Sequence, residues 1–396
     1  MSDACVETTG MRSAEPIPLI PGAINQSFSA DSEDAKAAPV SDPARWLDGF
    51  APGRRPALRA FGVEQEMGRG GTHPHTHASA PIIGRSRSVI AHERVAVARA
   101  ALADCHLCAH HCGVNRLAGE QGLCHAGAET RVFIAQTEVS DELELIPTFA
   151  IALSGCDLRC AFCITGKESW NPRAGEPLDP TRIAEQAEAA LEAGAKTIMI
   201  LGGEPTIHLP AALEIVAALP DEAKLIWKTN AHGSAQARAL LDGLFDVWLA
   251  DYKFGNDTCA ERLARIPDYT RIVRENLLWI SGRAVAADVR RLCTKSEIRN
   301  PKSENGRASS RRLLQTQRSS ELIVRHLVMP GHVECCWRPV AEWLATNLPA
   351  VKVNLRTGFW PAWQALRYSE LRGTVSSLER QQAAEIARGL DLNLVQ

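Results

Sequence analysis

The sequence predicts an α/β protein built on a parallel sheet, and two observations carry this prediction. From Thr148 onward, apolar strand-like runs alternate with helical runs, which is the pattern of βαβ units. The chain has 396 residues, 45% of them hydrophobic, so it can bury one core of the size found in α/β barrels, plus appendages. We therefore expect one main domain.

Each predicted element has its own signal. The helix after the first strand is marked by Asp179 as its cap, Pro180 in its first turn and Gly194 at its end. A C-terminal helix begins at a capping box formed by Ser376 and Glu379. The strands are expected at residues 148–154, 197–201, 224–228, 246–250, 321–328 and 351–355.

Two segments depart from the alternation. Residues 1–100 are rich in Ala, Pro, Gly, Ser and Arg and predict a mostly disordered extension, except for a short helix at 92–103. Residues 281–320 are rich in Ser, Arg, Lys and Asn and predict a disordered insertion before the fifth strand. The remaining chain divides into a cysteine-rich lead-in at 101–146 and a barrel domain at 147–396 that carries the insertion.

The net charge and the hydropathy of the sequence limit the classes of binding partner that we expect. The net charge is -2 at pH 7, so no global electrostatic bias recruits nucleic acid or an anionic membrane. The arginines of the insertion could touch RNA, but a solvated loop is the favoured interpretation. No apolar run approaches the length of a membrane span, and no signal peptide is recognised. A soluble cytoplasmic protein without a membrane partner is expected.

Cysteine usage indicates metal binding. A chain of this length without a secretion signal is expected to use its 12 cysteines as metal ligands or reduced thiols rather than in a disulfide framework. Seven of them form two tight groups, which are Cys105, Cys108, Cys112 and Cys124, and then Cys156, Cys160 and Cys163.

The second group places three thiols in one loop directly after the first strand. A cuboidal iron-sulfur cluster held by Cys156, Cys160 and Cys163 alone would keep one iron open to a substrate or cofactor. A zinc ion would need a fourth ligand, and this loop offers none. Zinc or free thiols are therefore the weaker interpretation.

Two motifs resemble the radical S-adenosylmethionine (SAM) superfamily. The first is the C-x3-C-x2-C pattern of the triad, with Phe162 before the last cysteine. The second is Gly202-Gly203-Glu204-Pro205 after the next strand, which is similar to the family's segment for the methionine amino group of SAM. The resemblance implies a [4Fe-4S] cluster, SAM, and an oxidoreductase that reductively cleaves SAM to a 5′-deoxyadenosyl radical.

Within that superfamily, residues 148–361 look most similar to the activating enzymes of glycyl-radical enzymes such as pyruvate formate-lyase, which share a partial (β/α)6 TIM-like barrel. Their Thr-Asn-Gly and Asp-x-Lys motifs correspond to Thr229-Asn230 and Asp251-Tyr252-Lys253. Ala231 replaces the glycine, and Lys228 stands where those enzymes carry an aspartate that helps hold a monovalent cation. Our hypothesis is that the Lys228 ammonium supplies that charge.

An uncharacterised branch of that group looks closer still. It is recognised by a cysteine-rich lead-in and by stretches similar to 269–276 and 323–332 of this chain. The resemblance implies radical chemistry and leaves the substrate open. The alternatives are activation of a glycyl-radical partner, radical modification of a small molecule or a non-glycyl peptide site, and a metal-stabilised binding protein with an inactive barrel.

The predicted site follows from these motifs. No catalytic residue is expected beyond the cluster ligands, and the partners implied are SAM, an electron donor and a candidate protein substrate. The residues expected to bind the cofactor are Gly202, Gly203, Glu204, Thr229, Asn230, Asp251 and Lys253.

The first cysteine group predicts a second metal site. Four thiols suit a closed site, for which structural zinc leads, an auxiliary iron-sulfur cluster comes second and uncoordinated thiols third. His73, His75 and His77 lie in a linker and are interpreted as unstructured. The Cys335-Cys336 pair is either reactive vicinal thiols or an ordinary loop. The histidines beside the first group are His106, His110, His111 and His125.

Overall fold

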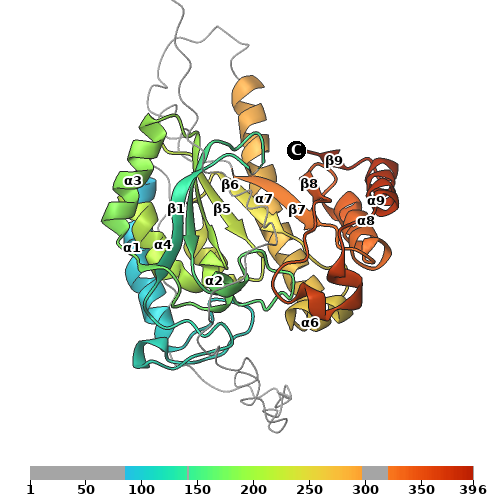
Figure 1. Ribbon diagram of the computed structural model, residues 1–396. Helices are drawn as coiled ribbons and strands as arrows, with labels where there is room; N and C mark the ends of the chain where they lie inside the picture. The colour runs from blue at the N-terminus through green and yellow to red at the C-terminus, as the bar shows by residue number, and fades with distance from the viewer. Residues whose placement is uncertain (1–84, 141, 297–319, 396) are drawn as a thin grey trace, which may run out of the picture. The chain divides into compact units, whose positions relative to one another are not determined.

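A computed structural model describes residues 85–140, 142–296 and 320–395, with backbone alone for 283–296 (Figure 1). These residues all belong to one compact unit, His77–Gln396. The predictions for the N-terminal extension before residue 85, including His73, His75 and His77, lie outside the described residues.

A mixed sheet forms the centre of this unit. Its strand order among the described residues is β3-β1-β2-β4-β5-β6-β7-β8-β9. The run from β2 to β8 is parallel throughout, which confirms the predicted α/β class and is consistent with a partial TIM-like barrel. Its six strands are β2 (Thr148–Leu153), β4 (Thr197–Gly202), β5 (Leu225–Thr229), β6 (Val247–Asp251), β7 (Glu321–Leu327) and β8 (Lys352–Arg356).

Three further strands extend the two edges of the sheet. β1 (Arg131–Glu138) pairs antiparallel with β2, and β3 (Glu176–Pro177) pairs with β1. β9 (Asn393–Leu394) lies parallel to β8. The sequence analysis did not predict β1, which lies within the predicted lead-in at 101–146. Its residues are half-buried and mixed in polarity, and β2 supplies the pairing that makes them a strand.

Helices cover the outside of the parallel strands (Figure 1). Asp179 caps α3 (Pro180–Glu192), and the capping box of Ser376 and Glu379 opens α9 (Ser377–Gly389), as predicted. The other helices are α1 (Arg87–Ala100), α2 (Gly166–Trp170), α4 (Leu209–Ala218), α5 (Ala235–Leu241), α6 (Asp257–Ala264), α7 (Tyr269–Ser296) and α8 (Arg338–Asn347).

Two predicted boundaries are corrected. α1 begins at Arg87, ahead of the predicted start at 92, because Ser86 accepts a hydrogen bond from the Val89 amide and caps it. α7 continues to Ser296, so the helix does not end at 281 where the insertion was expected to begin. The rest of the predicted insertion, 297–319, lies outside the described residues.

Packing on both faces of the sheet explains why the parallel strands have continuously apolar sequences. Side chains of β4 alternate between two layers: Ile198 and Ile200 pack with the helices, and Met199 points into the barrel with Ile226 and Ile323. The cavity described below lies beyond this inner apolar layer, at the carboxyl ends of the strands. No helix in the described part of the chain combines the length and apolar character that a membrane crossing requires.

Candidate active site

A cavity of about 830 Å³ lies at the carboxyl ends of the parallel strands. It brings together all ten residues that the sequence analysis assigned to the cluster or to its cofactor. These are Cys156, Cys160, Cys163, Gly202, Gly203, Glu204, Thr229, Asn230, Asp251 and Lys253.

The cysteine loop follows β2 and is held by α6. The amide of Arg159 donates to the carbonyl of Ala264 at 3.0 Å, and the amide of Ala161 donates to that of Leu263 at 2.8 Å. The buried ring of Phe162 packs against Phe254, with centroids 6.0 Å apart. The aromatic residue before the last cysteine therefore anchors the loop.

The thiols of this loop fit a multi-iron cluster better than one zinc ion. Cys156 and Cys160 are buried, and burial raises the pKa of Cys156 and raises that of Cys160 to about 12. Cationic iron would compensate the thiolate charge that this environment disfavours. Among the described residues, the groups whose ligand atoms all lie within 4.8 Å of one another do not include this triad. A tetrahedral zinc ion would bring sulfur atoms to about 3.8 Å from one another, whereas a cuboidal cluster is larger.

Gly202 and Gly203 are required by backbone packing. Gly202 has φ +145°, and a Cβ there would collide with the backbone of Leu153. A Cβ on Gly203 would collide with the carbonyl of Gly155, one residue before the first cysteine of the triad. The described contacts show that both glycines let the end of β4 lie directly against the end of β2.

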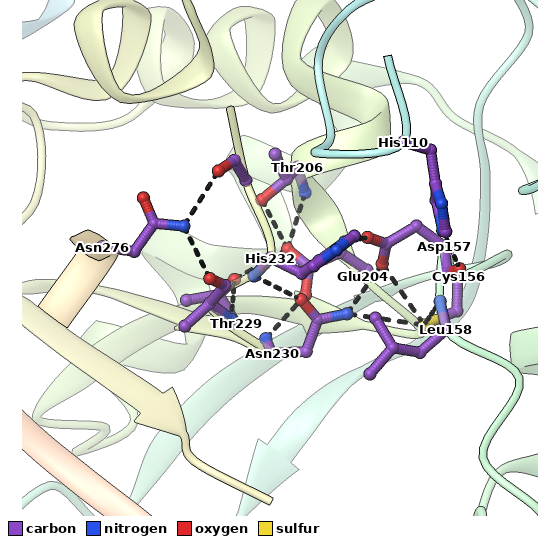
Figure 2. A network of polar contacts seen from close by, with 12 residues as sticks. His110, Cys156, Asp157, Leu158, Glu204, Thr206, Thr229, Asn230, His232 and Asn276 are labelled. Atoms are coloured by element: carbon purple, nitrogen blue, oxygen red, sulfur yellow. Dashed lines mark hydrogen bonds and ion pairs between the residues drawn. The ribbon is translucent and has the colours of Figure 1, made fainter. Parts of the chain in front are cut away.

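Glu204 connects the end of β4 to the end of β5 (Figure 2). Its carboxylate accepts hydrogen bonds from the Thr229 hydroxyl at 2.8 Å and from the Asn230 amide at 2.7 Å. It also accepts from the amide and hydroxyl of Thr206. The pKa of Glu204 is raised to about 7, mainly by burial and secondly by the negative charge of Asp157. These contacts give Glu204 a positioning role.

Asp157 is a central residue of the site that the sequence analysis missed. Its carboxylate accepts from Asn230 Nδ2 and contacts His232 Nδ1, each at 2.7 Å (Figure 2). Burial alone would raise the pKa of Asp157, but the hydrogen bonds and charges of His232, His110 and Asn230 together outweigh burial and lower that pKa. The available signal was an acidic residue inside the cysteine motif, with His232 two positions after Asn230.

A cluster of charged side chains forms another wall of the cavity. Lys253 Nζ lies 2.5 Å from Asp251 Oδ2, and Arg325 Nε lies 3.6 Å from Asp251 Oδ1 and 3.2 Å from Glu142 Oε1. Burial would raise the pKa of Asp251, but the charges of Lys253, Arg325 and Lys228 outweigh burial and lower it. Lys228 also lines the cavity. His326, next to Arg325, is buried elsewhere and bonds the Tyr252 carbonyl at 2.7 Å.

The first cysteine group surrounds a second, small cavity. All four of its cysteines line that cavity, together with Arg116, and none of the neighbouring histidines does. Arg116 is buried, and its Nη1 lies 3.7 Å from Cys105 Sγ while donating to the Ile207 carbonyl at 2.7 Å. Its other side-chain bonds go to the carbonyl of Gly127. Thiolates would balance this buried cation.

The lead-in that carries these cysteines is attached to the main site. The amide of Ala109 donates to the His232 carbonyl at 3.0 Å, and His110 Nε2 bonds the Asp157 carbonyl at 2.9 Å. Arg159 Nη2 donates to the Leu123 carbonyl at 2.8 Å. The two cysteine groups therefore belong to one continuous polar network.

The fold and the cavity define a barrel enzyme with a three-cysteine cluster loop. Residues 151–280 match the family model described as the Radical SAM superfamily. The similarity of this stretch to the family implies a [4Fe-4S] cluster and SAM as cofactors. The triad lines a cavity with a glycine-rich segment beside it and provides the soft ligands that such a cluster needs.

Two curated proteins are similar in sequence. One is an uncharacterised protein of Methanocaldococcus jannaschii, 27% identical over 312 residues, which cover 76% of this chain and 79% of that protein. The other is a 7-carboxy-7-deazaguanine synthase of Rhodopirellula baltica, 34% identical over 84 residues, which cover 20% of this chain and 31% of that enzyme.

Solved structures give weaker similarities. SuiB of Streptococcus suis, bound to the precursor peptide SuiA, is 12% identical with a TM-score of 0.40, over 60% of this chain and 46% of that chain. A radical SAM methyltransferase from Sphaerobacter thermophilus is 16% identical with a TM-score of 0.38, over 62% of this chain and 65% of that chain. The chain therefore spans less than half the length of SuiB.

Proposed function

We propose that the protein is a SAM-cleaving radical enzyme that acts on a polypeptide. The observation that carries this proposal is the single cavity lined by the cysteine triad and the seven further predicted residues. Cys156, Cys160 and Cys163 would hold the cluster. When bound, the cluster and SAM supply one-electron chemistry that breaks a carbon-sulfur bond of SAM and yields a 5′-deoxyadenosyl radical.

The residues around the triad are suited to adjusting the cluster. The Leu158 amide donates to Cys156 Sγ at 3.4 Å, and Asn230 Nδ2 lies 3.8 Å from the same sulfur. Hydrogen bonds to sulfur ligands raise the reduction potential of iron-sulfur centres by stabilising the reduced, more negative form. Asp157 and His232 hold Asn230 in place for this contact.

The cationic wall is suited to an amino-acid carboxylate. Lys228 and Arg325 both line the cavity, and Asp251 lies between their charges. We propose that Lys228 supplies the positive charge that a monovalent cation supplies in the pyruvate formate-lyase activating enzymes. SAM cleavage is then expected to be insensitive to replacement of potassium by a large organic cation in the wild type. Strong stimulation by added potassium or sodium would contradict the assignment.

The rim of the cavity supports a polypeptide substrate. Four large apolar side chains that line the cavity are exposed: Ile164 by 81%, Trp360 by 68%, Val139 by 64% and Leu143 by 58%. Exposed apolar groups beside a cavity are typical of interaction sites. The first candidate is a glycine of a glycyl-radical partner, because Thr229-Asn230 and Asp251-Tyr252-Lys253 resemble motifs of the activating enzymes.

Radical formation is tested with anaerobically reconstituted protein. Incubation with SAM and a strong reductant should release 5′-deoxyadenosine, measured by chromatography. Cys156→Ala, Cys160→Ala and Cys163→Ala should each abolish it, and the control Cys5→Ala should not. Product from a triad variant, or none from well-reconstituted wild type, would overturn the proposal and favour the inactive-barrel alternative.

Substrate class is tested by isotope transfer. Candidate partner proteins, labelled with deuterated glycine, are incubated with the active enzyme, and the 5′-deoxyadenosine is examined by mass spectrometry. Transfer of deuterium together with a glycyl radical signal in electron paramagnetic resonance supports the activase. Stimulation of SAM cleavage only by small molecules from cell extract would favour the small-molecule alternative.

We propose that the first cysteine group holds an iron-sulfur cluster rather than zinc. The four thiols surround a cavity, yet no three of them belong to the described groups whose ligand atoms lie within 4.8 Å of one another. One zinc ion would draw its sulfur ligands to about 3.8 Å from one another. The variant Cys108→Ala/Cys124→Ala should lose about four irons per chain. Loss of one zinc with unchanged iron would restore the zinc interpretation.

A further inference from the structure

A third group of metal-binding side chains lies away from both cavities. It consists of Cys259, His332, Cys335 and Cys336, whose ligand atoms all lie within 4.8 Å of one another. None of these residues lines either cavity described above. The sequence analysis interpreted Cys335 and Cys336 as reactive thiols or an ordinary loop, and did not connect them with Cys259 or His332.

The distances within this group match a tetrahedral site. His332 Nδ1 lies 3.2 Å from Cys335 Sγ, 3.6 Å from Cys336 Sγ and 3.6 Å from Cys259 Sγ. Cys335 Sγ lies 3.9 Å from each of the other two sulfur atoms. With Zn–S near 2.3 Å and Zn–N near 2.0 Å, the edges of a zinc tetrahedron are about 3.8 Å between sulfurs and about 3.5 Å from nitrogen to sulfur.

We propose that these four residues bind a structural zinc ion in a Cys3His site. Three thiolates and one imidazole are a donor set that selects zinc in a closed site. A disulfide does not explain the geometry, because bonded sulfurs lie about 2.05 Å apart and all three cysteines are free. This proposal is independent of the radical chemistry and goes beyond it.

The surroundings supply the contacts that such a site needs. Asn256 Nδ2 lies 3.3 Å from Cys259 Sγ and 3.8 Å from Cys336 Sγ, where it can donate to thiolates. If Nδ1 of His332 binds zinc, Nε2 carries the proton, and Glu370 Oε1 lies 3.8 Å from it. Arg262 is 3.4 Å from the same nitrogen and pairs with Glu370 at 2.5 Å. At 3.8 Å this carboxylate lies just outside hydrogen-bond distance, and a small shift of Glu370 toward Nε2 would give the carboxylate support that is common for zinc-bound histidines.

Two helix starts converge on this site. Cys259 is the third residue of α6, where the helix dipole favours a thiolate. His332, Cys335 and Cys336 come from the turn at Val333–Trp337 and the residue before it, which lead into α8. Cys335 is exposed and gives the ion a path from solvent, whereas the other three ligands are buried.

The proposed ion lies at the opposite end of α6 from the cluster loop. Leu263 and Ala264, at the end of α6, accept the amide hydrogens of Ala161 and Arg159 in that loop. Gly255 lies in the segment between Phe254 and α6, and Phe254 packs on Phe162 of the cluster loop. Gly255 is so close to the backbone of Cys336 that a Cβ on it would collide with that backbone. Zinc would therefore fix the helix that positions the radical-forming cysteines.

The first test is elemental and spectroscopic, on full-length protein without added zinc. The Cys108→Ala/Cys124→Ala variant removes the first cysteine group as a source of zinc. We expect it to retain about one zinc per chain, with a zinc X-ray absorption spectrum that fits three sulfurs and one nitrogen. Protein that is folded but binds no zinc when offered one equivalent, or a spectrum of four sulfurs, would overturn the proposal.

Matched variants locate the ion. Cys335→Ser changes an exposed ligand and should weaken zinc affinity by about tenfold or more, measured by competition with a chelator. Glu334, in the same turn, pairs with Arg338 at 2.6 Å, so Glu334→Gln should retain full affinity. Equal affinity in the two variants would place the zinc elsewhere. If Cys335→Ser fails to fold, the spectrum of the Cys108→Ala/Cys124→Ala protein decides.

Discussion

At the scale of single residues, Ala231 shows how the chain departs from the resembling enzymes. It has φ +58°, the left-handed conformation, at the position where those enzymes carry glycine. Asn276 Nδ2 donates to its carbonyl at 2.7 Å, and its own amide donates to the Thr229 hydroxyl at 3.1 Å. These bonds hold a conformation that costs an L-residue about 1–2 kcal/mol.

Ala231→Gly should therefore change the free energy of unfolding by less than about 1 kcal/mol. The relief of backbone strain offsets the greater flexibility of glycine and the loss of one buried methyl group. Ala237→Gly is the matched control, because Ala237 is equally buried but helical, in α5. It should destabilise by about 2 kcal/mol in denaturant unfolding. Equal losses at both sites would contradict the strain argument.

Glu204 predicts a pH dependence of stability. Its pKa is about 7 in the folded protein against an ordinary 4.5, so the folded state binds the proton more tightly than the unfolded state does. Its contribution is fully present below about pH 4.5 and is lost as the pH rises toward 7. Glu204→Gln should flatten the fall in stability between these pH values in iron-free protein, measured by urea unfolding. A slope unchanged by the substitution would refute the assignment.

Some residues of the site could be predicted from the sequence and others could not. The cluster cysteines and the glycine-rich segment could be predicted because their order along the chain is itself a motif. Asp157 and His232 could not, because their importance arises from a contact across the fold at 2.7 Å. Cys259 and His332 were missed for the same reason, since 73 positions separate them in the sequence.

At the scale of secondary-structure elements, α1 depends on one buried ion pair. Arg87 Nη1 lies 3.0 Å from Asp246 Oδ2, and Nη2 donates to the carbonyls of Pro220 and Asp221. The helix thereby attaches to the loops that precede β5 and β6. A short amphipathic helix would be marginal alone in water, so this attachment determines its stability.

Arg87→Ala should destabilise the protein by about 3–5 kcal/mol, because it removes the buried cation that pairs with Asp246 and donates to the carbonyls of Pro220 and Asp221. Arg99→Ala, on an exposed position of the same helix, should change stability by less than about 0.5 kcal/mol. Thermal unfolding of both variants gives the comparison. A small effect at Arg87 would mean that apolar packing of α1 on α4 is sufficient.

The parallel strands were predictable as elements because both of their faces are buried and their apolar runs are continuous. Strand β1 could not be predicted, because its sequence of mixed polarity becomes a strand only when β2 offers an edge for pairing. The end of α7 was misplaced because the polar composition after residue 281 is compatible with a helix as well as with a loop.

At the scale of the whole molecule, the cavity rim should separate radical formation from substrate modification. Ile164→Glu and Trp360→Glu place charges on the exposed apolar rim and leave the cysteine triad unchanged. If the substrate is a polypeptide, both should reduce its modification by about tenfold, or about 1.4 kcal/mol, while uncoupled SAM cleavage remains within about twofold.

The matched control for the rim variants is Leu378→Glu. Leu378 is 63% exposed on α9 and does not line the cavity. It should affect neither SAM cleavage nor modification of the partner, both followed by mass spectrometry. Equal losses in all three variants would point to a general loss of solubility, and no loss in any of them would contradict a polypeptide at the rim.

The pairing of β1 with β2 has a consequence for how this protein can be divided. Because β1 belongs to the lead-in and β2 carries the cluster loop, the two predicted segments share one sheet. A fragment that starts at residue 147 would expose the edge of β2 and remove the partner of the Asp157 carbonyl. The lead-in is therefore not an interchangeable module, and exchange between homologues should succeed only when both segments are transferred together.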